Sequence, residues 1–90
     1  MSRIYEIIIS KTACPAAVTD TFYGIAESLD DAICRFTSKF GISITQVIND
    51  GSDDINRAEY LGKFNKPGQG AKYGIHKPFV IFVDILKQSF

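Results

Sequence analysis

The apolar positions of this chain fall into short runs whose spacing predicts five strands and one helix. Two of these runs, Arg3–Ser10 and Phe79–Leu86, are apolar on both faces apart from Glu6 in the first and Asp84 in the second. A strand with two apolar faces usually lies inside its sheet, where other layers cover both sides. We therefore expect these two segments to be the central strands.

The helix is predicted over Leu29–Phe40 by apolar residues at helical spacing and by signals at both ends. Ser28 is a favourable N-cap residue, and Asp31 three positions later gives a capping-box arrangement. Gly41 stands where many helices end in a left-handed residue. The apolar stripe that should pack on the sheet consists of Leu29, Ala32, Ile33, Phe36 and Phe40.

Three further runs complete the predicted strands, and they span Asp20–Ala26, Ile42–Ile48 and Arg57–Phe64. In the run that follows the helix, polar and apolar residues alternate as they do in a half-buried strand. Ile42 and Ile44 should face the core, with Val47 and Ile48 as further candidates.

The resulting order, β-β-α-β-β-β, predicts an α+β fold. If the first and last strands are neighbours, short antiparallel connections place the second strand beside the first, and the fourth and then the third beside the last. The helix then covers one face of a single antiparallel sheet of four to five strands. Because both central strands are apolar on both sides, we expect the other face to be covered as well, by the loop at 11–19, by a glycine-rich loop or by a second subunit.

Length and composition predict one globular domain over residues 1–90. The apolar fraction is 46%, which is ordinary for a folded chain. No apolar run approaches the ~20 residues that a transmembrane helix needs, and the first ten residues do not have the pattern of a signal peptide. We expect a cytoplasmic protein that is not bound to membranes.

Motifs for catalysis, nucleotide binding and metal binding are absent or incomplete. His76 is the only histidine, and Cys14 and Cys34 have neither C-x-x-C spacing nor a histidine cluster. The acidic turn at 49–54 does not have the glycine and glutamate positions of a calcium loop. The glycines at 68–74 are not followed by the Lys-Ser/Thr ending of a phosphate-binding loop. We expect two reduced thiols, no enzyme activity, no cofactor and no metal.

Residues 60–78 form a basic, glycine-rich stretch. Four lysines and the histidine lie in it, together with four of the seven glycines and no aspartate or glutamate. Positions 20–59 instead hold eight acidic residues against three basic ones, although the chain as a whole has no net charge. This division of charge indicates a surface that meets a charged macromolecule.

Two sets of residues are candidates for contact with that partner. The first set lies in the basic stretch and consists of Lys63, Lys66, Lys72, Tyr73 and Lys77. The second set would form an acidic surface and consists of Asp30, Asp31, Asp53 and Asp54.

The segment from Thr21 onward has a layout in which a short strand runs into the helix start Ala-Glu-Ser-Leu-Asp-Asp-Ala at 26–32. A loop-rich pair of strands follows, and the strand Pro-Phe-Val-Ile-Phe-Val at 78–83 comes last. In size and layout the chain resembles small phage-borne anti-CRISPR proteins that act on type I surveillance complexes. That class shares no catalytic residues, so no residue role is carried over. The resemblance implies a non-enzymatic protein that binds a host effector and blocks its engagement of target DNA.

Two function hypotheses follow. The first is a phage or mobile-element inhibitor, monomeric or homodimeric, that binds a host protein or ribonucleoprotein complex. The alternative is a nucleic-acid-binding module whose 60–78 loop holds phosphates with its lysines and stacks bases on Tyr60, Phe64 and Tyr73. Against both stands a plainer interpretation, in which the lysines only keep the loop soluble and its aromatic residues fold into the core.

Overall fold

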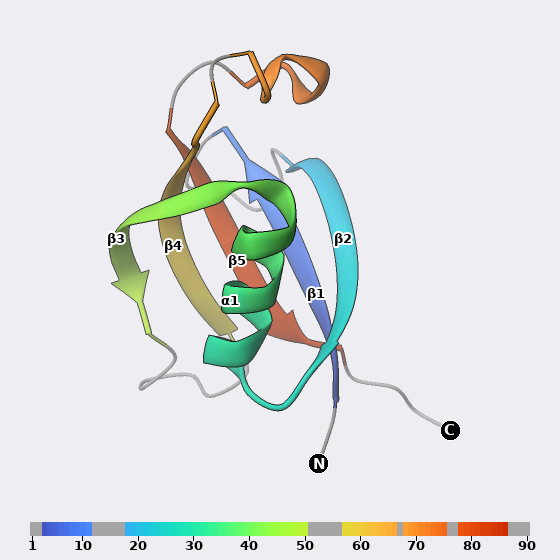
Figure 1. Ribbon diagram of the computed structural model, residues 1–90. Coiled ribbons are helices and arrows are strands. Elements are labelled where there is room, and N and C mark those ends of the chain that lie inside the picture. The colour runs from blue at the N-terminus through green and yellow to red at the C-terminus, as the bar shows by residue number, and fades with distance from the viewer. Residues whose placement is uncertain (1–2, 12–17, 51–56, 67, 76–77, 87–90) are drawn as a thin grey trace.

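One helix lies across one face of an open, five-stranded antiparallel sheet in the computed structural model of the chain (Figure 1). The structure describes residues 3–11, 18–50, 57–66, 68–75 and 78–86, and for Val18, Thr19 and Lys72 it describes the backbone alone. The elements are β1 (Arg3–Ser10), β2 (Val18–Ala26), α1 (Leu29–Phe40), β3 (Ile42–Asn49), β4 (Arg57–Phe64), the 3-10 turn η2 (Ala71–Tyr73) and β5 (Phe79–Ile85).

The strand order is β2-β1-β5-β4-β3, and every neighbouring pair is antiparallel. The α+β prediction and the predicted arrangement of strands are therefore confirmed, with the two doubly apolar strands at the centre. Three boundaries differ from the prediction. β2 begins two residues earlier, at Val18, β3 extends by one residue to Asn49, and β5 ends one residue earlier, at Ile85.

Helix α1 begins and ends where its capping signals predict. Ser28 has extended backbone angles, and its hydroxyl accepts the N–H of Asp31 at 3.1 Å. The Asp31 carboxylate in turn accepts the N–H of Glu27 at 2.9 Å, one residue before the N-cap itself. At the other end Gly41 has φ 66°, a left-handed conformation that costs little in a residue without Cβ.

The core lies between α1 and the sheet. The helix contributes Ala32, Ile33 and Phe36, all of them buried. On the sheet side the buried residues of the three inner strands are Tyr5, Ile7, Ile9, Ala58, Tyr60, Phe79, Ile81 and Val83. A group of rings closes the β2 side, where Phe22 lies 5.3 Å from Phe36 and 4.8 Å from Phe40 between ring centroids.

The face of the sheet opposite the helix is partly covered by the sheet's own side chains. Phe82 is fully buried there, and the Arg57 guanidinium lies over its ring at 5.6 Å from the centroid. Arg57 also forms a two-point ion pair with Asp84, at 2.7 and 3.1 Å. Arg57, held by Asp84, therefore covers the apolar ring of Phe82 on this face. This is part of the cover that strands with two apolar faces require.

The prediction that Val47 and Ile48 face the core was wrong. The two side chains are 53% and 48% exposed, whereas Ile42 at the start of the same strand is buried. The register between β3 and β4 shifts after Ile44 and again after Val47. Such irregularities bend and twist an edge strand, and the apolar residues at this end of β3 are left exposed.

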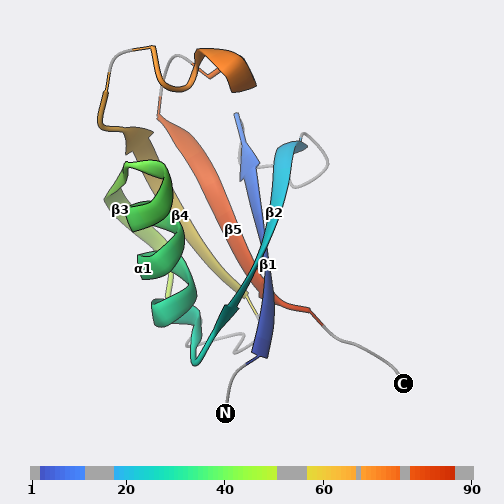
Figure 2. The ribbon, with the colours of Figure 1, turned by 45° about the vertical axis from the view of Figure 1, so that its right-hand side comes forward.

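The glycine-rich stretch is more structured than the sequence indicates. The Gln69 side chain donates a hydrogen bond to the carbonyl of Phe40 at the end of α1, and Ile75 is buried. Gly70 packs so closely that a Cβ there would lie 2.5 Å from the Ile75 carbonyl oxygen. Figure 2 shows this segment folded across the end of the sheet, beside the last turn of the helix. No helix in the described part of the chain is long and apolar enough to cross a bilayer.

Candidate partner-binding surfaces

Lysines from two separate parts of the sequence lie at one end of the molecule. Lys63 at the end of β4 and Lys66 just after it are both exposed, which confirms their predicted surface position. Lys11 follows β1 and reaches the same end, because its Nζ lies 3.2 Å from where a Cβ on Gly74 would stand. We call Lys11, Lys63 and Lys66 the basic end (the top of Figure 1).

Two lysines of the predicted set are only partly placed. Lys72 belongs to η2, whose backbone lies at the basic end, but its side chain is outside what the structure describes. Lys77 lies outside the described residues, as does the neighbouring His76.

The prediction from sequence missed Lys11, although the predicted topology contained the signal. Strands β1 and β5 are antiparallel neighbours, and Ser10 pairs with Val80. The end of β1 must therefore lie beside the start of β5, which is where the basic stretch ends. Placing each charged residue on the predicted strand order would have added Lys11 to the set.

The aromatic residues of the basic stretch are part of the packing. Tyr60 is buried in the core. Phe64 and Tyr73 are half-buried and stacked, with centroids 6.0 Å apart and ring planes within 7° of each other. The edge of Tyr73 also meets Phe22 at 6.1 Å. These rings help to hold η2 against the sheet and the helix-side ring cluster, and they do not stand out as a platform for nucleic-acid bases.

Acidic residues gather at the opposite end, around the start of α1. Glu27, Asp30 and Asp50 line an open hollow of about 480 Å³. Burial raises the pKa of the Tyr60 phenol, and the nearby charges of Asp30 and Asp50 raise it further. The predicted acidic surface thus holds Asp30 in an exposed position, while Asp53 and Asp54 lie outside the described residues.

Asp31 has a structural role within that acidic end. Its carboxylate accepts the Glu27 N–H and pairs with Arg35 at 2.9 Å. The bond from the Glu27 backbone N–H, followed by the Arg35 side chain, lowers the pKa of Asp31. A carboxylate held at both sides in this way is less free for a partner than Asp30.

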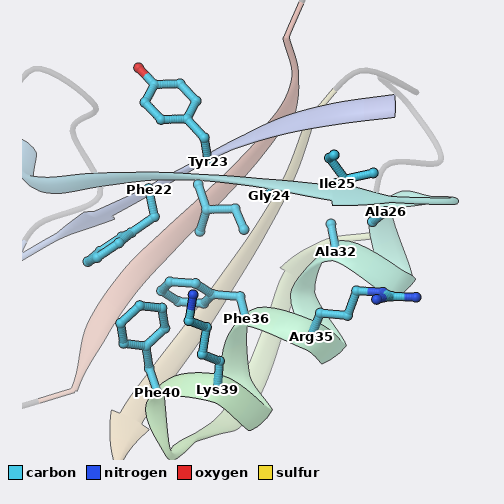
Figure 3. Close-up of a pocket in the computed structure, with 11 residues that line it drawn as sticks. Phe22, Tyr23, Gly24, Ile25, Ala26, Ala32, Arg35, Phe36, Lys39 and Phe40 are labelled. Carbon is cyan, nitrogen blue, oxygen red and sulfur yellow. The ribbon is translucent and has the colours of Figure 1, made fainter. Parts of the chain in front are cut away.

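A third surface, which the sequence did not indicate, is an apolar groove between β2 and α1 (Figure 3). Phe22, Gly24 and Ala26 line it from the strand, and Ala32, Phe36 and Phe40 line it from the helix. Lys39 and Arg35 stand along its helix wall. The hollow within it measures about 150 Å³, enough for one side chain about the size of a phenyl ring.

The described residues bring together no constellation that points to a reaction. No three His, Cys, Asp or Glu side chains among them are grouped as metal ligands would be. Cys34 is an exposed free thiol on α1, and Cys14 lies outside the described residues. No protein-family model, curated protein or solved structure matches the chain. The charged ends and the groove are therefore the features from which a function can be inferred.

Proposed function

We propose that this protein is a small, non-enzymatic inhibitor that binds a host nucleic-acid-processing complex through its basic end and blocks target engagement, in the manner of type I anti-CRISPR proteins. The observation that carries the proposal is the gathering of Lys11, Lys63 and Lys66 at one end of a chain without net charge. Charge separated in this way steers and orients association with a macromolecule that bears the opposite charge.

A protein or ribonucleoprotein partner fits this end better than free nucleic acid. Lysines can pair with the acidic side chains of a protein or with the phosphates of a nucleic acid. Sequence-tolerant binding of single-stranded nucleic acid also relies on aromatic rings on which bases stack. Tyr73 and Phe64 stack on each other, and Tyr60 is buried. The nucleic-acid-binding alternative therefore keeps its electrostatic support and has no exposed aromatic residue of the basic stretch to add to it.

The test measures binding to a purified type I surveillance complex by surface plasmon resonance and target-DNA capture by gel shift. Replacing Lys63, Lys66, Lys72 and Lys77 by Glu should weaken binding by orders of magnitude. It should leave the fold intact, because surface charges contribute little to stability, about 0–1 kcal/mol per pair. A four-Glu variant that folds and keeps full affinity would exclude the basic stretch at 60–78 as the contact.

The matched control reverses charge at the other end, as Glu27→Lys with Asp30→Lys. If this control abolishes binding while the four-Glu variant does not, the acidic surface is the contact. Labelled single- and double-stranded oligonucleotides measured over a salt series test the alternative, because phosphate binding weakens steeply with salt. Strong, salt-dependent oligonucleotide binding without binding to the complex would favour the nucleic-acid module.

A further inference from the structure

We propose that the groove between β2 and α1 binds an extended segment of a partner protein, which adds to the sheet edge as a new strand and places an acidic side chain beside Lys39. None of the residues that line this groove is Lys11, Lys63 or Lys66. The inference takes from the proposed function only that the partner is a protein. The bound segment of the partner would have no fixed structure before it binds.

At the edge of β2, the β1–β2 pairing determines which residues direct their backbone N–H and C=O groups away from the sheet. The Leu86 N–H donates to the Ile4 carbonyl at 2.9 Å, so the backbone of Ile4 is turned toward β5. In an antiparallel ladder the bonding side alternates from residue to residue. Ile25, which lies opposite Ile4, therefore directs its N–H and C=O away from β1, and Tyr23 does the same two residues earlier.

These outward groups are free to pair within the described structure. Thr21, two residues before Tyr23, also directs its N–H outward, but this N–H already donates a hydrogen bond to the Asp20 carboxylate at 2.9 Å. No described hydrogen bond reaches the outward backbone groups of Tyr23 or Ile25. Their side chains are 62% and 65% exposed, so neither residue is shielded by its surroundings. An unpaired edge of this kind is a template for an added strand.

Only one of the two sheet edges has the regularity that strand addition needs. The β1–β2 register runs without interruption from Arg3 opposite Ala26 to Ile9 opposite Asp20. The other edge strand, β3, has two register shifts against β4. Bulges twist an edge and protect it from pairing. The regular edge is also the one that borders the groove.

Gly24 leaves room for a side chain of the incoming strand. A Cβ built on Gly24 would meet no atom within 4 Å, and this glycine lines the 150 Å³ hollow between Phe22 and the helix. Side chains of an added strand alternate between the two faces of the sheet. Every second one would point over the helix side of the edge, where apolar atoms of Phe36 and Ala32 form the wall (Figure 3).

The charge of the groove selects an acidic occupant. Of the residues that line the groove, the charged ones are Arg35 and Lys39, and neither is acidic. Arg35 is paired with Asp31, whereas Lys39 contacts the Phe40 ring at 5.6 Å and has no acidic partner among the described residues. A carboxylate on the incoming strand would supply that partner.

The same charges argue against a second copy of this chain as the occupant. Two β2 strands paired about a two-fold axis would place both helices on the same face, on either side of the seam. Each copy would bring Arg35 and Lys39 to that seam. The acid that β2 itself offers, Asp20, is engaged by the Thr21 N–H. Like charges would therefore face one another without compensation.

The experiment selects binders from a phage-displayed library of random seven-residue peptides on the full chain. In the enriched peptides, apolar residues should occur at every second position, and Asp or Glu should occur at a fixed position. A fluorescein-labelled consensus peptide is then measured by fluorescence anisotropy. Gly24→Val, which fills the hollow with a good strand former, should reduce its affinity by roughly tenfold or more. Gln46→Val puts the same side chain on the β3 edge and should leave the affinity unchanged.

Two further measurements test the mode of binding. Lys39→Glu should lower the affinity by roughly tenfold, and replacing the acidic residue of the peptide by Lys should restore it. Hydrogen exchange at the amides of Tyr23 and Ile25 should slow when the peptide is bound. Both effects are expected of a strand that adds to this edge.

The proposal is overturned if no peptide is enriched, if the consensus binds Gly24→Val as well as the parent, or if Lys39→Glu has no effect. A stable dimer in sedimentation that Gly24→Val dissociates would identify a second copy as the occupant instead. Because these assays contain no surveillance complex and leave Lys63 and Lys66 unchanged, failure here and failure of the proposed function are distinguishable.

Discussion

At the scale of single residues, Phe36 makes the contact that joins the helix to the sheet. Its side chain is buried, and its ring lies against Phe22 and Phe40. Phe36→Ala should lower the free energy of unfolding by about 3–5 kcal/mol, because it removes a buried ring together with its contacts to two neighbouring rings. Urea unfolding measures this, with Phe36→Leu as the control that should cost less than about 1.5 kcal/mol. A loss below about 1 kcal/mol for Phe36→Ala would contradict the assigned packing.

Ser28 is the residue on which the start of α1 depends. Its hydroxyl accepts the N–H of Asp31, which has no partner within the helix. Ser28→Ala should therefore cost about 1 kcal/mol in urea unfolding. Ser38→Ala, at an exposed position near the other end of the same helix, is the control and should stay within about 0.5 kcal/mol of the parent. Equal effects of the two substitutions would count against the cap.

Asp31 makes stability depend on acid pH. Its pKa is lowered in the folded state, first by the Glu27 N–H and then by Arg35. The carboxylate therefore favours folding above its ordinary pKa of about 4, and this contribution is lost as the pH falls through the lowered value. Asp31→Asn should be less stable than the parent at pH 7, and the difference should shrink toward pH 3. A difference that is the same at both pH values would show that the charge of Asp31 does not matter.

At the scale of elements, the glycine-rich segment behaves as a packed unit and not as a tether. Gly70→Ala should destabilise the protein by more than about 1 kcal/mol, because the new Cβ would stand 2.5 Å from the Ile75 carbonyl and 2.8 Å from Phe64. Gly24→Ala meets open space in a strand and should be neutral or stabilising by up to about 1 kcal/mol. Thermal unfolding of the pair checks both signs, and a destabilised Gly24→Ala would mean that the space is not open.

The elements themselves were predictable where their signals are local. Helix α1 matches its predicted bounds because Ser28 and Gly41 act within one turn of it. The folding of η2 was not predictable, since it depends on Gln69 reaching the Phe40 carbonyl and on Tyr73 stacking on Phe64. The first of these contacts joins positions far apart in the sequence, and neither contact follows a periodic pattern.

At the scale of the whole molecule, the sequence indicated a basic and an acidic surface as candidates for partner contact, but it did not indicate every residue that belongs to them. The division between basic and acidic segments follows from the order of residues alone. The fold places Glu27, Asp30 and Asp50 at the end opposite the basic end, whereas Asp20, which pairs with Ile9, lies near Lys11. The groove was beyond the reach of the pattern, because Phe22, Gly24 and Phe36 become neighbours only when α1 packs beside β2.

The separation of the two charged ends has a consequence for how this molecule moves toward a partner. A chain with no net charge feels no overall pull in a uniform field, yet a body 39 Å long with lysines at one end and carboxylates at the other is an electric dipole. A charged surface exerts a torque on it and turns the lysines forward before any contact is made. Raising the salt concentration should therefore slow association while leaving the dissociation rate nearly constant. Stopped-flow measurements would separate the two rates, and a salt effect confined to dissociation would mean that the molecule arrives without preferred orientation.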